Sequence, residues 1–235
     1  MAWAFVTGQF AQNSAAASGG AITATLPGNT TAGSTIVCCI ACASQTDVPA
    51  SVTHNAVGLT LRDSITNAEG WQMRWYTLDN IAGGATTVIY TPTANQSFRA
   101  IAVAEYSGLL PSGSYARGSW NRQSPSVTAT DGTVSGTVNT TTDQVPYLQV
   151  GITVDFNDTN DPAIGTGYAA RGNGWVFGGA VQAMQWEDAN RTSASATEQA
   201  TFTFPATSGI SYTGQIILLE PITQVVLPIM GQAML

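Results

Sequence analysis

TAGSTIVCCIACAS, residues 31–44, holds every cysteine of the chain and has the composition of a β-strand. Because side chains alternate between the two faces of a strand, Cys39 and Cys42 point to opposite sides, ~10 Å apart and beyond the ~7 Å limit for a disulfide. Cys38 and Cys42 share a face, but ~13 Å of strand separates them, too far for one tetrahedral zinc ion. The strand therefore predicts three packed thiols rather than a metal, redox or nucleophilic site.

A second copy of this strand indicates which face each thiol occupies. Aligning Thr31 with Thr142, 111 positions later, places Cys39 opposite Val150 on an apolar face, so Cys39 is expected in the core. The other side is predicted to be an outer apolar face made of Ile36, Cys38, Ile40 and Cys42. Such a face is unusually apolar for an open antiparallel sheet, and we expect a partner, a loop or a chain arm to cover it.

Other segments repeat in the same order. MRW at 73–75 recurs as MQW at 184–186, and AIAVAEY at 100–106 is echoed by QIILLEP at 215–221. The offset drifts only from 111 to 115 positions, which indicates two related halves of about 110 residues; chance similarity among β-strands is the alternative.

Short β-rich runs separated by Gly, Pro, Asn and Asp clusters predict an all-β chain. The expected fold is a two-sheet antiparallel β-sandwich of jelly-roll type over residues 1–221, with halves of about 1–117 and 118–221 that share one two-sheet core. An extended arm, 222–235, is expected to follow it.

Composition limits the partners. The net charge is −7, the pI is about 4.3 and no lysine occurs, so a nucleic-acid partner is not expected. No apolar run approaches the ~18 residues of a membrane helix, and the first residues lack the pattern of a signal peptide. We therefore expect a protein that does not bind membranes and is assembled in a cytosol.

Four segments together resemble a family. They are AITATLPGNTTAGSTIVCCIACAS (21–44), VGLTLRDS (57–64), MRWYTLDNIAGGATTVIYTPT (73–93) and RAIAVAEYSGL (99–109). They are similar to a broad group of β-sandwich proteins encoded by bacteriophages and bacteria, with a weaker echo over 130–220. The resemblance implies a sandwich framework and a virion structural or surface protein, usually not an enzyme.

The sequence offers residues for two catalytic arrangements, a nucleophilic triad and a carboxylate pair. His54 is the single histidine, so a nucleophilic triad would have to use it; a turn histidine is the simpler interpretation. Glu105, Glu187 and Glu220 could serve a glycan-cleaving enzyme, because carboxylate pairs hydrolyse glycosidic bonds. Since Glu105 belongs to the AEYSG framework segment, we expect it to bond a turn.

Two segments or residue sets could bind a ligand, a loop rich in Asp and Asn and a row of tryptophans. VDFNDTNDPAIGTG (154–167) could hold Ca²⁺ through Asp155, Asn157, Asp158 and Asp161, although it lacks the EF-hand pattern, and a solvated loop is the alternative. No other cofactor is expected. Tryptophans 71, 75, 120, 175 and 186 could form a sugar-stacking row or belong to the core.

The last segment, PITQVVLPIMGQAML (221–235), carries no charged side chain and is too short to span a bilayer. Its apolar content predicts docking onto a neighbouring subunit as an added strand or clamp, or folding back onto its own sandwich. The residues expected to carry this contact are Val225, Val226, Leu227, Pro228, Ile229, Met230 and Leu235.

The function expected from these features is a bacteriophage virion structural protein, either a capsid decoration (cement) protein or a tail-fibre or appendage component. It would be assembled in the host cytoplasm through the outer apolar face and the arm, with copies of itself and other virion proteins as partners. A carbohydrate-binding adhesin or module, with a host surface glycan as partner, is the first alternative. A glycan-cleaving enzyme is the second.

Overall fold

A computed structural model gives the structure of residues 3–13, 20–42, 49–66, 72–93, 99–110, 117–123, 132–134, 140, 145–156, 162–174, 182–203 and 210–219. All regular structure in these residues is β, and every strand pair is antiparallel. The expectation of an all-β antiparallel sandwich protein is confirmed.

The first half contains two sheets. The five-stranded sheet has the order β1 (Ala4–Asn13), β9 (Arg99–Ser107), β3 (Thr35–Cys42), β7 (Gln72–Leu78), β6 (Thr60–Thr66). The four-stranded sheet has the order β2 (Ile22–Thr25), β8 (Thr87–Pro92), β4 (Pro49–His54), β5 (Val57–Gly58).

The second half also contains two sheets. The five-stranded sheet has the order β10 (Arg117–Gln123), β17 (Ile210–Leu219), β12 (Tyr147–Phe156), β15 (Gln182–Arg191), β14 (Ala169–Gly174). The three-stranded sheet has the order β11 (Gly132–Val134), β16 (Thr201–Thr203), β13 (Ala163–Ile164).

The two halves share one topology. If the strands of each half are numbered in chain order, with the short β5 left out, both five-stranded sheets run first, eighth, third, sixth, fifth. Both smaller sheets run second, seventh, fourth. The repeated sequence landmarks therefore lie on strands with equivalent places in the two sheets. The jelly-roll assignment and the C-terminal arm stay predictions.

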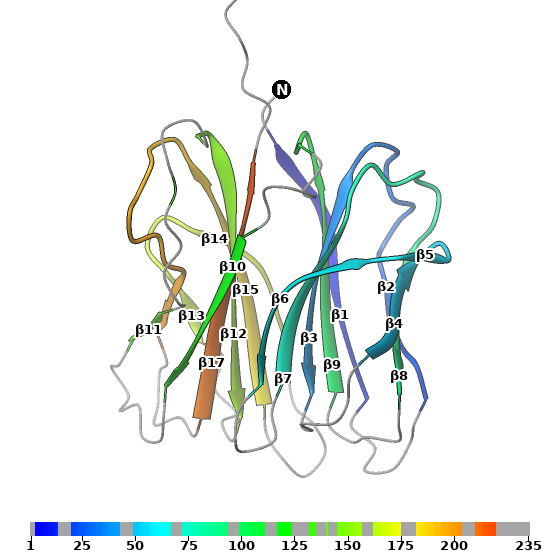
Figure 1. Ribbon diagram of the computed structural model, residues 1–235, viewed down its shortest axis with the longest axis horizontal. Coiled ribbons are helices and arrows are strands. Elements are labelled where there is room, and N and C mark those ends of the chain that lie inside the picture. The colour runs from blue at the N-terminus through cyan, green and yellow to red at the C-terminus, as the bar shows by residue number, and fades with distance from the viewer. Residues whose placement is uncertain are drawn as a thin grey trace, which may run out of the picture.

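The four sheets stack as four layers, with the two five-stranded sheets in the middle and a smaller sheet on each outside (Figure 1). One face of β3, with Val37, Cys39 and Ala41, packs in the central core between the five-stranded sheets. The other face, with Ile36 and Cys38, packs in a second core that β2, β4 and β8 complete.

These layers correct one expectation and confirm another. The halves do not share a single two-sheet core, because each has its own smaller sheet and the central core lies between the halves. Cys39 does lie in the central core, as expected, while Cys38 faces the other way.

The halves meet around a local pseudo-two-fold axis. The first strand of each five-stranded sheet contacts the last strand of the other, β1 against β14 and β10 against β6. Trp75 and Trp186, which occupy equivalent places on β7 and β15, meet edge to face with their ring centroids 5.4 Å apart. Like surfaces in contact with each other are the mark of an isologous interface, here formed within one chain.

The hairpin between β4 and β5 gives a first prediction. His54 and Val57 pair across a two-residue turn whose Asn55 and Ala56 have φ of 49° and 62°. A left-handed alanine costs roughly 1–2 kcal/mol, so Ala56→Gly should raise the free energy of unfolding by about 1 kcal/mol in urea denaturation. The matched control, Ala50→Gly on an exposed strand position, should lower it by about 0.5–1 kcal/mol. A loss of stability at Ala56→Gly would contradict the turn geometry.

Candidate functional site

The three cysteines lie within the fold and are fully buried as free thiols. Burial raises the pKa of the Cys38 and Cys39 thiols well above the ordinary value. The thiolate is the reactive form, so neither group is poised for nucleophilic or redox chemistry.

The expectation that the outer apolar face of β3 is an assembly surface is wrong, because this face is buried within the chain. Ile36, Cys38 and Ile40 belong to the second core, and Cys42 is 1% exposed. The sequence indicated rightly that this face needs a cover, but the cover is the chain's own four-stranded sheet rather than a partner.

Thiol accessibility gives a second prediction. Ellman's reagent should titrate well under one thiol per native chain within minutes and all three after unfolding in guanidinium, because the reagent needs an exposed thiolate. A stoichiometric reaction of the native protein would contradict the burial of β3.

Glu105 bonds a turn, as the framework segment predicted. Its Oε1 accepts the backbone N–H of Thr31 at 2.7 Å, and the side chain is fully buried. It shares a strand face with Ile101 and Val103, so it belongs to the outer side of the first half's five-stranded sheet.

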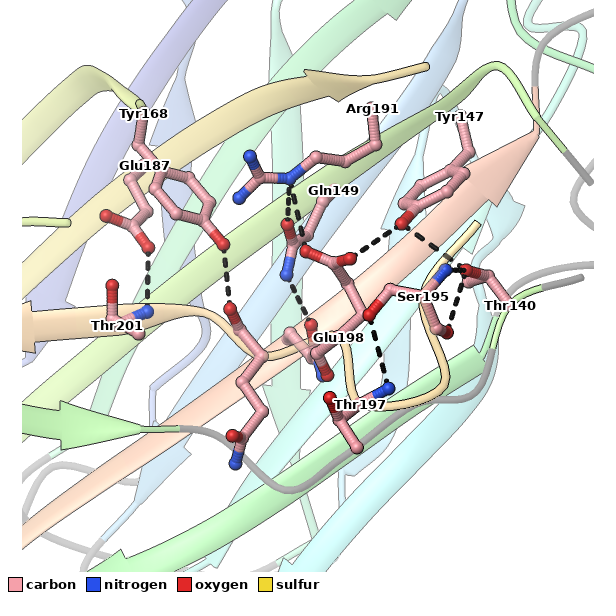
Figure 2. Close-up of polar contacts among 12 residues, drawn as sticks. Thr140, Tyr147, Gln149, Tyr168, Glu187, Arg191, Ser195, Thr197, Glu198 and Thr201 are labelled. Carbon is pink, nitrogen blue, oxygen red and sulfur yellow. Dashed lines mark hydrogen bonds and ion pairs between the residues drawn. The ribbon is translucent and has the colours of Figure 1, made fainter. Parts of the chain in front are cut away.

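Glu187 occupies the corresponding side of the second half. Its Oε2 accepts the Gly165 N–H at 2.8 Å. Its Oε1 accepts the Thr201 N–H at 3.3 Å (Figure 2), and the two bonds tie β15 to the three-stranded sheet. Burial raises the pKa of Glu187 to about 8, although both backbone donors favour the carboxylate.

Gly151 makes room for this carboxyl group. A Cβ on Gly151 would lie 2.6 Å from the Ala200 Cβ and 2.9 Å from the Glu187 Oε1. Gly151 lies opposite Glu187, the residue after Trp186, as Cys38 of the first half lies opposite Tyr76, the residue after Trp75. A polar tie therefore replaces an apolar contact between the sheets of the second half.

Further polar contacts continue through the second half (Figure 2). The Arg191 Nε donates to the Gln149 Oε1 at 2.7 Å and lies 3.2 Å from the Glu198 Oε1. The Gln149 Nε2 donates to the Gln215 Oε1 at 2.6 Å, and the Tyr147 hydroxyl donates to the Glu198 Oε2 at 2.8 Å. Each of these side chains is used to hold β12, β15 and β17 against the segment 195–203, which is a structural role.

A polar chain also joins the two halves. The Trp186 Nε1 donates to the Tyr106 hydroxyl at 3.1 Å, and that hydroxyl donates to the Asp188 Oδ2 at 3.0 Å. The Arg171 Nε donates to the same oxygen at 2.6 Å, and its guanidinium lies over the Phe5 ring at 4.4 Å. Burial raises the pKa of both Tyr106 and Asp188. Sequence reasoning missed this chain.

A repeated bulge positions the arginine. Arg171 lies at a register shift between β14 and β15, and Arg62 lies at the equivalent shift between β6 and β7. The Arg62 Nε donates to Thr77, the residue two after Trp75, and Arg171 bonds Asp188, the residue two after Trp186. The dipeptides Arg62–Asp63 and Arg171–Gly172 are the sequence signal that could have revealed this repeated bulge.

Glu105 and Glu187, the described candidates for a catalytic carboxylate pair, do not share a site. Glu105 faces the outer sheet of the first half, whereas Glu187 faces the outer sheet of the second half, with the central core between them. Glu220 lies outside the described residues.

The tryptophans and the calcium-loop residues expected from the sequence have different places. Trp75 and Trp186 are core residues, whereas the side chains of Trp71, Trp120 and Trp175 lie outside the described part. The calcium candidates Asn157, Asp158 and Asp161, the side chain of Asp155 and the whole arm also lie outside it. Among the described residues no group of three or more His, Cys, Asp or Glu could hold a metal ion.

His54 is buried rather than exposed in its turn. Its Nε2 lies 3.2 Å from the Thr30 hydroxyl oxygen and its Nδ1 lies 2.9 Å from the Thr87 carbonyl oxygen, so both ring nitrogens are engaged. The ring lines a pocket of ≈ 210 Å³ beside the β4–β5 turn and the loop 78–82. No sequence pattern indicated this pocket, because its two walls are distant in the chain.

Among the described residues, none forms a helix with the length and apolarity needed to cross a membrane.

No family model matches the chain, and no curated protein matches it. Among solved structures, it is similar to the major capsid protein P2 from Bacteriophage PM2, with 8% sequence identity over 93% of this chain and 99% of that chain. The TM-score of 0.25 is too low to define a shared fold.

Proposed function

We propose that the chain is a structural protein of a bacteriophage virion, a capsid decoration protein or a component of a tail fibre or other appendage. One observation carries the proposal: the thiols and the polar side chains that could have served catalysis are buried inside the fold. The thiols, His54, Glu105 and Glu187 are all buried, and the histidine and both carboxylates bond the backbone or side chains of neighbouring segments.

Two further features support the proposal. In the part of the chain that the structure describes, each half has eight main strands in two sheets. The first strand lies beside the eighth and the second beside the seventh, a pairing that supports the eight-stranded, double-sheet jelly rolls of viral capsid and lectin domains as the model. The framework segments also resemble sandwich proteins of phages, and Glu105 of AEYSG serves that framework by bonding Thr31.

Of the two assembly surfaces expected from the sequence, the β3 face and the arm, the β3 face is excluded. Because the apolar face of β3 is buried within the chain, it is not available to neighbouring subunits. Assembly with copies of itself and with other virion proteins would then rest on the arm, 222–235, whose uncharged apolar sequence is costly to leave in water.

Location in the particle tests the proposal. An antibody raised against the purified chain should label virions purified from the strain that encodes it, in immunogold electron microscopy, at regular positions on the capsid or the tail. Label confined to cell debris, with no chain detected by mass spectrometry in purified particles, would contradict a virion role.

The role of the arm is tested by size in solution. Deletion of 222–235 should convert an oligomer to a monomer in light scattering coupled to gel filtration, while replacing the single arm residue Gln224 by Ser should leave the oligomer intact. A full-length chain that is monomeric at every concentration would contradict assembly through the arm.

A further inference from the structure

The pocket beside His54 is bounded by a loop and a hairpin turn, each held in place by hydrogen bonds. The loop that forms one wall is attached to the segment before β3 by three backbone bonds: Ile81 N–H to Ser34, Gly33 N–H to Ile81, and Gly84 N–H to Thr30. At Gly83 (φ 76°) a Cβ would lie 2.6 Å from a backbone nitrogen, so the loop packs as closely as glycine allows.

The other wall is the β4–β5 turn, fixed from beneath by the buried His54. Non-glycine residues with positive φ in the described chain are Asn55, Ala56 and Asn80, and all three belong to the two segments that form the pocket. These left-handed residues fix the hairpin turn and the loop in the conformations that bound the pocket.

The lining combines an apolar wall with a polar rim. Val57 is 54% exposed although it is large and apolar, and Leu78 and Ile81 extend the apolar surface. The exposed Asn55 and Asn80 lie at the rim and offer amide donors and acceptors.

Asp79 adds an oriented acceptor to this rim. One carboxylate oxygen is 3.4 Å from the Thr35 hydroxyl, and the other is 3.6 Å from a guanidinium nitrogen of Arg62. These contacts hold the carboxylate in place beside the exposed amides of the rim.

We propose that this pocket binds one neutral pyranose ring, the terminal sugar of a surface glycan. A pyranose presents C–H groups that pack on an apolar wall and hydroxyl groups that bond amides and a carboxylate. Among the described residues that line the pocket, none is a Lys or Arg that would attract an anionic ligand. Its volume of ≈ 210 Å³ is below the roughly 300–1,000 Å³ of sites for drug-sized ligands, so it suits one ring.

This site differs from the tryptophan row considered in the sequence, because the described residues that line it include no Trp, Tyr or Phe. It also goes beyond the virion role: the binding measurement succeeds or fails whether or not the chain is part of a particle.

Saturation-transfer NMR on the full chain, with a panel of neutral hexoses, pentoses and N-acetylhexosamines, tests the proposal. At least one sugar should receive saturation and bind with a millimolar Kd. Ala82→Trp, at an exposed residue of the lining, should abolish that signal, whereas the control Ala21→Trp, at an exposed residue outside the lining, should preserve it.

The rim is tested separately. Asn55→Gly and Asn80→Gly keep the left-handed backbone and remove the amides, and each should weaken binding about fivefold, the loss of one hydrogen bond. Absence of binding by every sugar of the panel, or binding unchanged in Ala82→Trp, would overturn the proposal.

Discussion

Replacing Trp75 by alanine should lower the free energy of unfolding by about 3–5 kcal/mol, as for other large buried aromatic residues. Trp75 is fully buried in the central core, where its ring meets the Trp186 ring edge to face. The substitution leaves a cavity on the pseudo-two-fold axis, where neither half can close it alone. Urea denaturation followed by circular dichroism measures the loss.

Two comparisons make this prediction specific. Leu61→Ala, at a large apolar residue that is 44% exposed, should change stability by less than about 0.5 kcal/mol. A double-mutant cycle of Trp75→Ala with Trp186→Ala should give a coupling of about 0.5–1.5 kcal/mol. Additive effects of the two substitutions would mean that the rings do not meet.

The second large effect concerns pH. The folded-state pKa of Glu187 is about 8, whereas its ordinary value is 4.5, so between these pH values the folded chain binds more protons than the unfolded chain. Stability should therefore fall as pH rises from about 4.5 to 8, by on the order of 4–5 kcal/mol from this group. Below pH 4.5 both states are protonated and the contribution is constant.

Glu187→Gln isolates this contribution because glutamine cannot ionise. The variant should lose less stability than the wild type over the same pH range, in urea denaturation at several pH values. At low pH it should be somewhat less stable, since an amide offers a poorer fit to the N–H groups of Gly165 and Thr201. Parallel curves for the two proteins would contradict a raised pKa at Glu187.

The sequence predicted the two faces of β3 because strand alternation is local. Cys39 lies in the central core and Cys38 faces the other way, as the strand and its aligned copy indicated. The role of Glu105 followed in the same way from its framework segment, and the contact to Thr31 agrees with it.

The cover over the second face was not predicted because it is made by short strands paired over long distances. β2 has four residues and β5 two, too few for a pattern that distinguishes sheets. The pairing of β2 with β8 joins residues more than 60 positions apart. The sequence therefore showed that a cover was required but not which segments supply it.

The contacts of the polar groups in the candidate sites could not be predicted from the sequence for a different reason. The space for Glu187 is a missing side chain at Gly151, and a glycine in a strand has several explanations. The bonds of Tyr106 to Asp188 and Trp186 depend on how the two halves face each other, which neither half encodes alone. The His54 pocket depends likewise on the approach of the loop 78–82 to the β4–β5 turn.

Nuclear Overhauser spectroscopy on a sample labelled at tryptophan tests the face-to-face packing of the two halves most directly. The account predicts cross-peaks between the indole protons of Trp75 and Trp186, whose ring centroids are 5.4 Å apart. Assigned indole resonances with no cross-peak between these two residues would contradict the four-layer arrangement.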